Sequence, residues 1–191
     1  KRTDQLVLCS KHGGLDVFRA KFCTGLLFSL GIAGTFAIFT IGLSLMVYGV
    51  DGFQGAFQLE YTGSSQPITV GQAVVIAYSM VAFTGVFMGA LVMMLSECLH
   101  NSVGALAISL GMIVLPMMVN VPEEYRVLGQ LWSYLPGESV AVWSMFNPQT
   151  VSVGEVVLTA WQAVPILYMV LIGVFWHLTK IKFIGYQVGG R

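Results

Sequence analysis

Four long stretches of the chain contain no Asp, Glu, Lys or Arg: residues 22–50, 61–96, 99–122 and 156–179. Roughly 20 apolar residues, rising about 1.5 Å each, are needed for a helix to cross the hydrocarbon core of a bilayer. The pattern therefore predicts four membrane-spanning helices, near residues 22–48, 70–95, 103–121 and 157–178. The first two exceed the minimum length, which favours tilting or projection beyond the bilayer.

Two short patterns mark helix starts. Thr69 stands three residues before Gln72, and Ser152 stands three residues before Glu155. Each pair is typical of a capping box, in which the hydroxyl residue and the later Glu or Gln satisfy each other's backbone N–H groups. We therefore expect the second and fourth spans to begin at these two places.

The composition fits a membrane protein and excludes a soluble one. Hydrophobic residues make up 56% of the 191 residues and charged residues only 9%, whereas soluble domains carry about 25% charged residues. Disorder is also excluded, because it requires low hydrophobicity and high charge. Nine Lys and Arg balance nine Asp and Glu, so nothing in the charge indicates a nucleic-acid partner. The predicted fold is an all-α, polytopic helix bundle in the lipid bilayer.

The positions of the basic residues predict the orientation of the chain in the membrane. All nine except Arg126 precede the first predicted span or follow the last. An even number of spans places both ends on one side, and the excess of Lys and Arg predicts that this side is cytoplasmic. We expect a multi-pass protein of the cell (plasma) membrane, with a transmembrane domain over residues 22–178 and a cytoplasmic tail over residues 179–191.

Catalytic motifs are missing from the sequence. It holds no G-x-x-x-x-G-K-[ST] loop, no H-E-x-x-H, no G-x-S-x-G and no pair of carboxylates within a span. We therefore do not expect an enzyme. Glu97, Cys98 and His100 cluster near the turn between the second and third spans, but a polar helix end is a better interpretation than a metal site. No metal is expected.

Small residues predict close helix packing. Gly85 and Gly89 form a GxxxG motif in the second span, and Ala107 with Gly111 forms a similar pair in the third. Packing within the bundle is favoured over a seam between two copies of the chain, and both remain open.

Hydroxyl residues inside the spans have two interpretations. They could line a pathway suited to amphipathic or hydrophobic cargo, or they could bond carbonyl groups of their own helices, which is the commoner arrangement. The residues concerned are Thr35, Thr40, Ser79 and Thr84.

The first 21 residues predict a cytoplasmic element. Asp4 can cap a short helix that Gly13 and Gly14 end. The alternation of apolar and charged residues over 15–21 then predicts an amphipathic elbow leading into the first span. A simple basic anchor beside the membrane is the alternative.

The segment near residues 122–151 on the outer face is apolar but interrupted by Pro136 and Gly137. It is too short and too broken to span twice. We expect two short helices that dip into the outer leaflet as a re-entrant pair, with their backbone shielded by protein.

The order of these elements resembles the later part of an ABC type-2 transporter permease. The stretch TDQLVLCSKHGGLDVFRAKF is similar to that family's GTDxLLLSSxxGRxxVxxAKxxA-like segment, and His12 and Gly14 depart from it. The matching residues are Thr3, Asp4, Gln5, Leu6, Ser10, Lys11, Gly13, Ala20 and Lys21. The resemblance covers nearly the whole chain as spans three to six of six, so we expect two further spans upstream of this segment.

The resemblance implies a division of labour. A separate nucleotide-binding ATPase subunit would bind ATP and Mg, so this chain would bind no cofactor itself. Its short cytoplasmic helix would act as a coupling helix on that subunit, and a second permease copy or paralogue would complete an export pathway. The residues implied in ATPase coupling are Asp4, Gln5, Leu6, Leu8, Ser10, Lys11, Gly13, Asp16 and Arg19.

Two other functions remain open at this point. The chain could belong to an ion-coupled secondary transporter or channel, although His177 is the only imidazole within a predicted span. It could also be a non-transporting membrane scaffold or sensor subunit. The sequence does not select a substrate.

Overall fold

A computed structural model of the chain describes residues 14–62, 64, 66–119, 121, 125–141, 145–146, 150–153 and 156–189. This part of the chain is mostly helical, which agrees with the predicted all-α class. The elements in chain order are α2 (Leu15–Tyr48), α3 (Phe57–Glu60), α4 (Val70–Leu99), α5 (Ser102–Met118), α6 (Arg126–Ser133), α7 (Pro136–Val140), β1 (Thr150–Val153), β2 (Val156–Thr159) and α9 (Ala160–Gly189).

Three helices, α2, α4 and α9, are long and apolar enough to cross a membrane. They indicate a multi-pass membrane protein, as the hydrophobic pattern predicted. The third predicted span corresponds to α5, an apolar helix of 17 residues. This helix is at the short end of the range of about 17–25 residues that transmembrane helices occupy.

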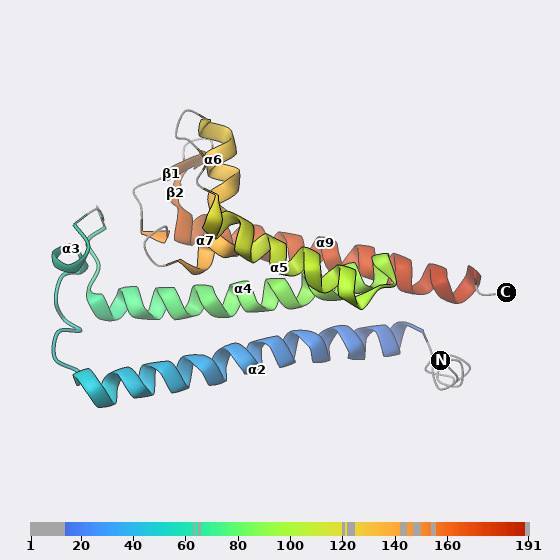
Figure 1. Ribbon diagram of the computed structural model, residues 1–191, viewed down its shortest axis with the longest axis horizontal. Coiled ribbons are helices and arrows are strands. Elements are labelled where there is room, and N and C mark those ends of the chain that lie inside the picture. The colour runs from blue at the N-terminus through green and yellow to red at the C-terminus, as the bar shows by residue number, and fades with distance from the viewer. Residues whose placement is uncertain are drawn as a thin grey trace.

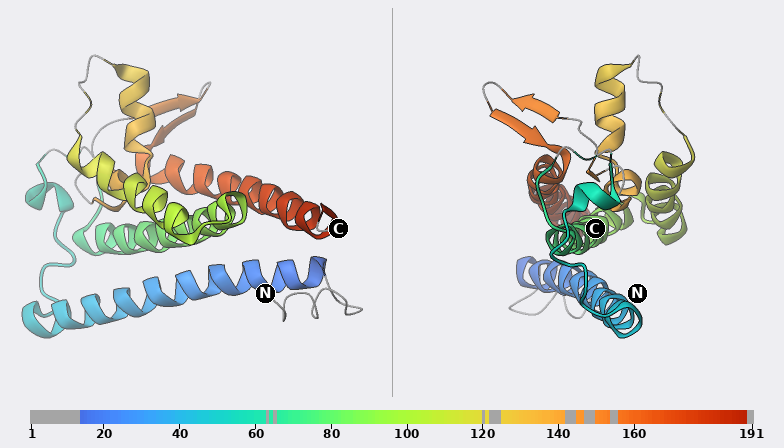
Figure 2. Two further views of the ribbon diagram at one scale, coloured as in Figure 1. Left: turned by 45° about the vertical axis from the view of Figure 1, so that its right-hand side comes forward. Right: turned by 90° about the vertical axis from the view of Figure 1, so that its left-hand side faces the viewer.

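The four long helices run along the long axis of the molecule (Figure 1). α2 begins and α9 ends at one end, which we call the terminal end. The short elements α3, α6 and α7 and the β-hairpin lie at the other end, which we call the hairpin end. α4 contacts α2, α5, α7 and α9, and the end-on view in Figure 2 shows α2 on one side of α4 and α5 and α9 on the other. α4 is therefore the central helix.

The capping box at Thr69 is confirmed. The Thr69 hydroxyl accepts a hydrogen bond from Gln72 N at 3.3 Å, and Gln72 Oε1 accepts one from Thr69 N at 3.1 Å. α4 ends at Leu99 and is followed by His100, its C-cap residue, whose φ of 51° is left-handed. Asn101 then caps α5 by accepting from Val103 N at 3.0 Å. These two caps allow α4 and α5 to be joined by a very tight turn.

The second predicted capping box is wrong. Ser152 lies in β1, opposite Val157 of β2 in an antiparallel hairpin, and α9 begins at Ala160 rather than near residue 157. β-branched residues occupy three of the four positions in each strand, and such side chains favour extended backbone. The α9 start uses a later pair, in which Gln162 Oε1 accepts from Thr159 N at 3.3 Å.

Two helices extend beyond the predicted spans. α2 is one continuous helix from Leu15 to Tyr48, so residues 15–21, predicted as an amphipathic elbow, form its first turns. α9 continues to Gly189, so most of the predicted tail over 179–191 is helical. Two short helices, α6 and α7, do occupy the predicted outer segment, which the hairpin follows.

Gly85 and Gly89 of α4 pack against α2 of the same chain. A Cβ atom placed on Gly85 would lie 3.6 Å from Ala33 Cβ, and one on Gly89 would collide with the Ser29 side chain. Ser29 in turn donates to Gly25 O at 3.0 Å. The absence of side chains at Gly85 and Gly89 therefore lets the two backbones approach closely.

The second small pair makes no comparable contact within the described part of the chain. Ala107 is exposed. A Cβ atom on Gly111 would meet only Leu115 of its own helix, at 3.9 Å.

This packing predicts that Gly89→Leu destabilises the protein by about 1–3 kcal/mol, the usual cost of overpacking. The matched control is Gly173→Leu, because a Cβ atom there would meet nothing within 4 Å. Thermal unfolding in detergent should show a lower Tm for Gly89→Leu alone. Equal Tm values for the two variants would contradict a tight seam between α2 and α4.

Candidate functional site

Seven residues implied in ATPase coupling lie outside the described residues: Asp4, Gln5, Leu6, Leu8, Ser10, Lys11 and Gly13. The other two, Asp16 and Arg19, lie in the first turns of α2 with exposed side chains. The structure thus describes the point at which the predicted coupling segment enters the bundle.

The beginning of α2 is fixed to α9 by aromatic rings. Phe18 and Phe22 are buried, and their ring centroids lie 5.0 and 4.8 Å from that of Trp176 in edge-on arrangements. Phe18 also lies 5.7 Å from Phe183. Such edge-on pairs contribute about 0.5–1.5 kcal/mol each beyond the burial of their area.

An ion pair fixes the same turns of α2 to α4. Lys21 Nζ bonds Glu97 Oε1, and the ammonium lies 5.8 Å from the centroid of Phe183. Lys21 is exposed, so this pair adds at most about 1 kcal/mol and the aromatic contacts dominate. We call the whole set the terminal anchor: Phe18, Lys21, Phe22, Glu97, Trp176 and Phe183.

Glu97, one of the three residues considered for a metal site, belongs to the terminal anchor. Glu97 binds Lys21, while Cys98 is exposed near the end of α4. Among the residues that the structure describes, no three His, Cys, Asp or Glu side chains are grouped to hold a metal ion.

Three buried hydroxyl groups meet nearer the hairpin end. Thr84 of α4, Ser139 of α7 and Tyr168 of α9 are 3%, 2% and 1% exposed. Ser139 Oγ lies 2.7 Å from the Tyr168 hydroxyl and 3.4 Å from Thr84 Oγ1. Tyr168 donates to the carbonyl of Tyr134 at 3.0 Å. We call these three side chains the hydroxyl cluster.

The three hydroxyl groups and the carbonyl of Tyr134 can form one continuous chain of hydrogen bonds. If Tyr168 donates to Tyr134 O, its oxygen can accept from Ser139, and Ser139 can accept from Thr84. The carbonyl of Pro136, 3.2 Å from Ser139 Oγ, competes for the single serine proton. The cluster thus satisfies backbone carbonyls where α6 ends and α7 begins, groups that are costly to bury without partners.

Packing holds α7 in place around this cluster. The ring of Phe87 stacks on Tyr168 at 4.2 Å with 12° between the planes. Gly137 lies so close to the carbonyl of Ile113 in α5 that any side chain would collide with it. α7 is therefore inserted between α4, α5 and α9.

Tyr134 contacts the hydroxyl cluster by hydrogen bonding only through its backbone carbonyl. Its side-chain hydroxyl is buried and has no hydrogen-bond partner among the described atoms. Burial raises the pKa of this hydroxyl above its usual value of 10.0.

The hydroxyl residues for which a pathway lining and bonding to their own helices were both open separate into two groups. Thr35, Thr40 and Ser79 donate to carbonyls of their own helices at 2.8, 2.8 and 2.7 Å. Thr84 instead belongs to the hydroxyl cluster.

Sequence reasoning missed the partners of Thr84, which are Ser139 and Tyr168. A usable signal existed, because Tyr168 is the only tyrosine in the last uncharged stretch. A buried tyrosine usually finds a hydrogen-bond partner.

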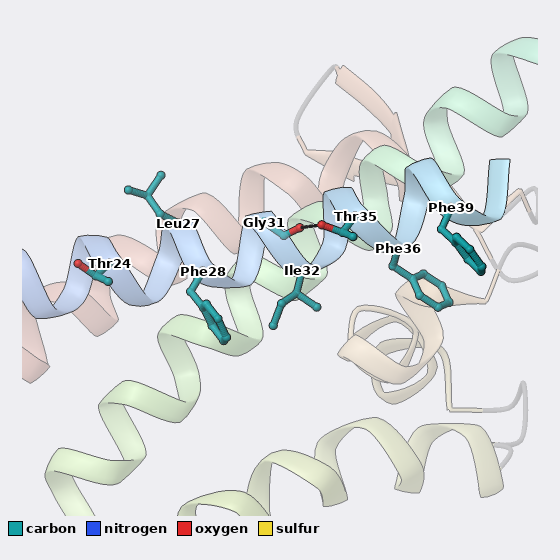
Figure 3. A pocket seen from close by; sticks show the side chains of 8 residues that line it. All are labelled: Thr24, Leu27, Phe28, Gly31, Ile32, Thr35, Phe36 and Phe39. Carbon is teal, nitrogen blue, oxygen red and sulfur yellow. Dashed lines mark hydrogen bonds between the residues drawn. The ribbon is translucent and has the colours of Figure 1, made fainter. Parts of the chain in front are cut away.

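The outer face of α2 is a long apolar surface (Figure 3). A shallow groove follows it, lined by Thr24, Leu27, Phe28, Gly31, Ile32, Thr35, Phe36 and Phe39. The Thr35 hydroxyl is already bonded to Gly31 O, so this face offers few polar groups for ligand recognition. It is suited to contact with lipid or with another apolar helix.

The chain matches no protein-family model, no curated protein and no solved structure. Its function must therefore be argued from the terminal anchor, the hydroxyl cluster and the sequence motif.

The hydroxyl cluster predicts that Tyr168→Phe destabilises the protein by about 1 kcal/mol, the usual value of a hydrogen bond between membrane helices. Tyr48→Phe is the control, because Tyr48 is exposed at the end of α2. Unfolding in mixed detergent micelles measures both free energies. A loss no larger than that of Tyr48→Phe would show that the cluster contributes nothing.

Proposed function

We propose that this chain is the membrane-spanning permease subunit of an ATP-binding cassette transporter, coupled to a separate ATPase subunit. The observation that carries the proposal is the terminal anchor. The segment that resembles a coupling helix leads directly into turns of α2 that are fixed to both α4 and α9. A displacement of that segment would therefore move three helices together.

The charge distribution supports an orientation for this permease. Every basic residue except Arg126 belongs to one of two groups. One group lies before α2 or in its first two turns, and the other lies in the last part of α9 or after it. α2 begins and α9 ends at the terminal end (Figure 1). We place the terminal end in the cytoplasm and the chain in the plasma membrane. α5, which follows α4 through the tight turn at His100 and Asn101, serves as the third of four spans.

The position of α7 supports a role in closing the pathway on the outer side. α7 is re-entrant in this proposal, because it packs against α4 and α5 and its Ser139 bonds Tyr168 of α9. Opening would separate Ser139 from Thr84 and Tyr168. A second permease copy or paralogue completes the pathway, and its apolar surroundings suit amphipathic or hydrophobic cargo.

The first experiment purifies the full protein with its ATPase partner from native membranes and measures ATP-driven transport in proteoliposomes. Deletion of residues 4–14 should abolish association, and Asp4→Lys or Lys11→Glu should lower ATPase recovery. Asp51→Lys is the matched control, because Asp51 follows the C-terminal end of α2, whereas residues 4–14 precede its N-terminal end. Association that survives the deletion would refute the coupling role.

A charge swap tests the terminal anchor in the same assay. Lys21→Glu places two carboxylates together and should reduce transport per ATP hydrolysed. Combining it with Glu97→Lys restores an ion pair and should restore coupling. Reduced transport that the swap fails to restore would contradict the ion pair's role. Transport driven by an ion gradient without nucleotide, or no flux at all, would contradict the permease proposal.

A further inference from the structure

α6 is an amphipathic helix whose apolar side faces outward. Val127, Leu128 and Leu131 share one side of the helix, and they are 72%, 54% and 64% exposed. Gly129, Gln130 and Ser133 share the other side and are partly buried. An amphipathic helix on a protein surrounded by water has the opposite orientation, with its apolar side on the core.

This orientation indicates the surroundings of α6. Leaving a large aliphatic side chain in water forgoes about 1.5–3 kcal/mol of burial energy, and α6 exposes three of them. An apolar medium outside the protein removes that penalty. The partly buried polar side of α6 then needs no contact with water, and Ser133 Oγ donates within the helix to Gln130 O at 2.8 Å.

The position of α6 is that of an interfacial helix. It lies across the direction of the long helices, at the hairpin end of the bundle (Figures 1 and 2). Trp132 Nε1 donates to the carbonyl of Val119, directly after α5, at 2.9 Å. Tryptophan is enriched at the depth where spans meet the headgroups, so this bond fixes α6 near the end of a span.

We propose that α6 lies in the plane of the membrane leaflet at the hairpin end. The side chains of Val127, Leu128 and Leu131 insert among the acyl chains just below the headgroups, as those of interfacial amphipathic helices do. Met117 and Met118 at the end of α5 are exposed as well, next to Val119, whose carbonyl Trp132 bonds. This assignment does not depend on the transport role.

Lipid is a better occupant than a second copy of the chain. A stable protein interface buries about 800 Å² on each partner, and three aliphatic side chains on an eight-residue helix supply only part of that area. Lipid requires no minimum contact area on α6, because the same lipid also surrounds the spans next to this helix.

Spin-label accessibility in lipid nanodiscs tests the proposal. The full chain, with Cys9, Cys23 and Cys98 replaced by alanine, receives one label at Leu128→Cys or Leu131→Cys. Discs of phosphatidylcholine and phosphatidylglycerol hold one chain each. We expect frequent collisions with oxygen and few with a water-soluble nickel chelate, so that the oxygen-to-nickel ratio is severalfold above that at Asp51→Cys. The matched label at Gln130→Cys should collide less with oxygen than its two neighbours.

Two results would overturn the proposal. Nickel collisions at residues 128 and 131 as frequent as at residue 51 would place α6 in water. The second measurement uses discs that hold two chains. There, infrequent collisions with both reagents together with dipolar broadening between the labels would show that a second copy covers the helix.

Discussion

The structure depends on α4 having two different sides. One side carries Gly85 and Gly89 and lies directly against Ala33 and Ser29 of α2. The other carries Thr84 and Phe87, which reach Ser139 and Tyr168. Apolar helices gain little from associating in lipid by hydrophobicity alone, so close backbone packing and buried hydrogen bonds must hold them together. α4 supplies both.

α4 connects the two candidate functional regions, one near its C-terminal end and one at its middle. Glu97 belongs to the terminal anchor, and Thr84 belongs to the hydroxyl cluster 13 residues earlier, roughly 20 Å along the same helix. In the proposed permease, α4 is therefore the element that would carry a displacement at the coupling segment to α7.

Much of this fold could be predicted from the sequence, because uncharged stretches and the Thr69 capping pattern are local features. The pairing of β1 with β2 was missed because the spacing of Ser152 and Glu155 also occurs by chance. The β-branched residues of both strands favoured extended backbone instead of a helix start. The continuity of α2 was missed because an amphipathic lead-in and the first turns of a long helix have the same pattern. The bond between Ser139 and Tyr168 joins residues 29 apart, and only the packing of α7 brings them together.

The most direct measurement is disulfide formation between Ala33→Cys and Gly85→Cys in a chain without other cysteines. The structure separates these two Cβ positions by 3.6 Å, which fits the spacing of about 3.5–4.5 Å in disulfides. Mild oxidation should join the two cysteines within one chain, while Gly34→Cys with Gly85→Cys should remain reduced, because a Cβ on Gly34 meets nothing within 4 Å. A linked dimer, or no bond at all, would contradict the packing of α4 on α2 of the same chain.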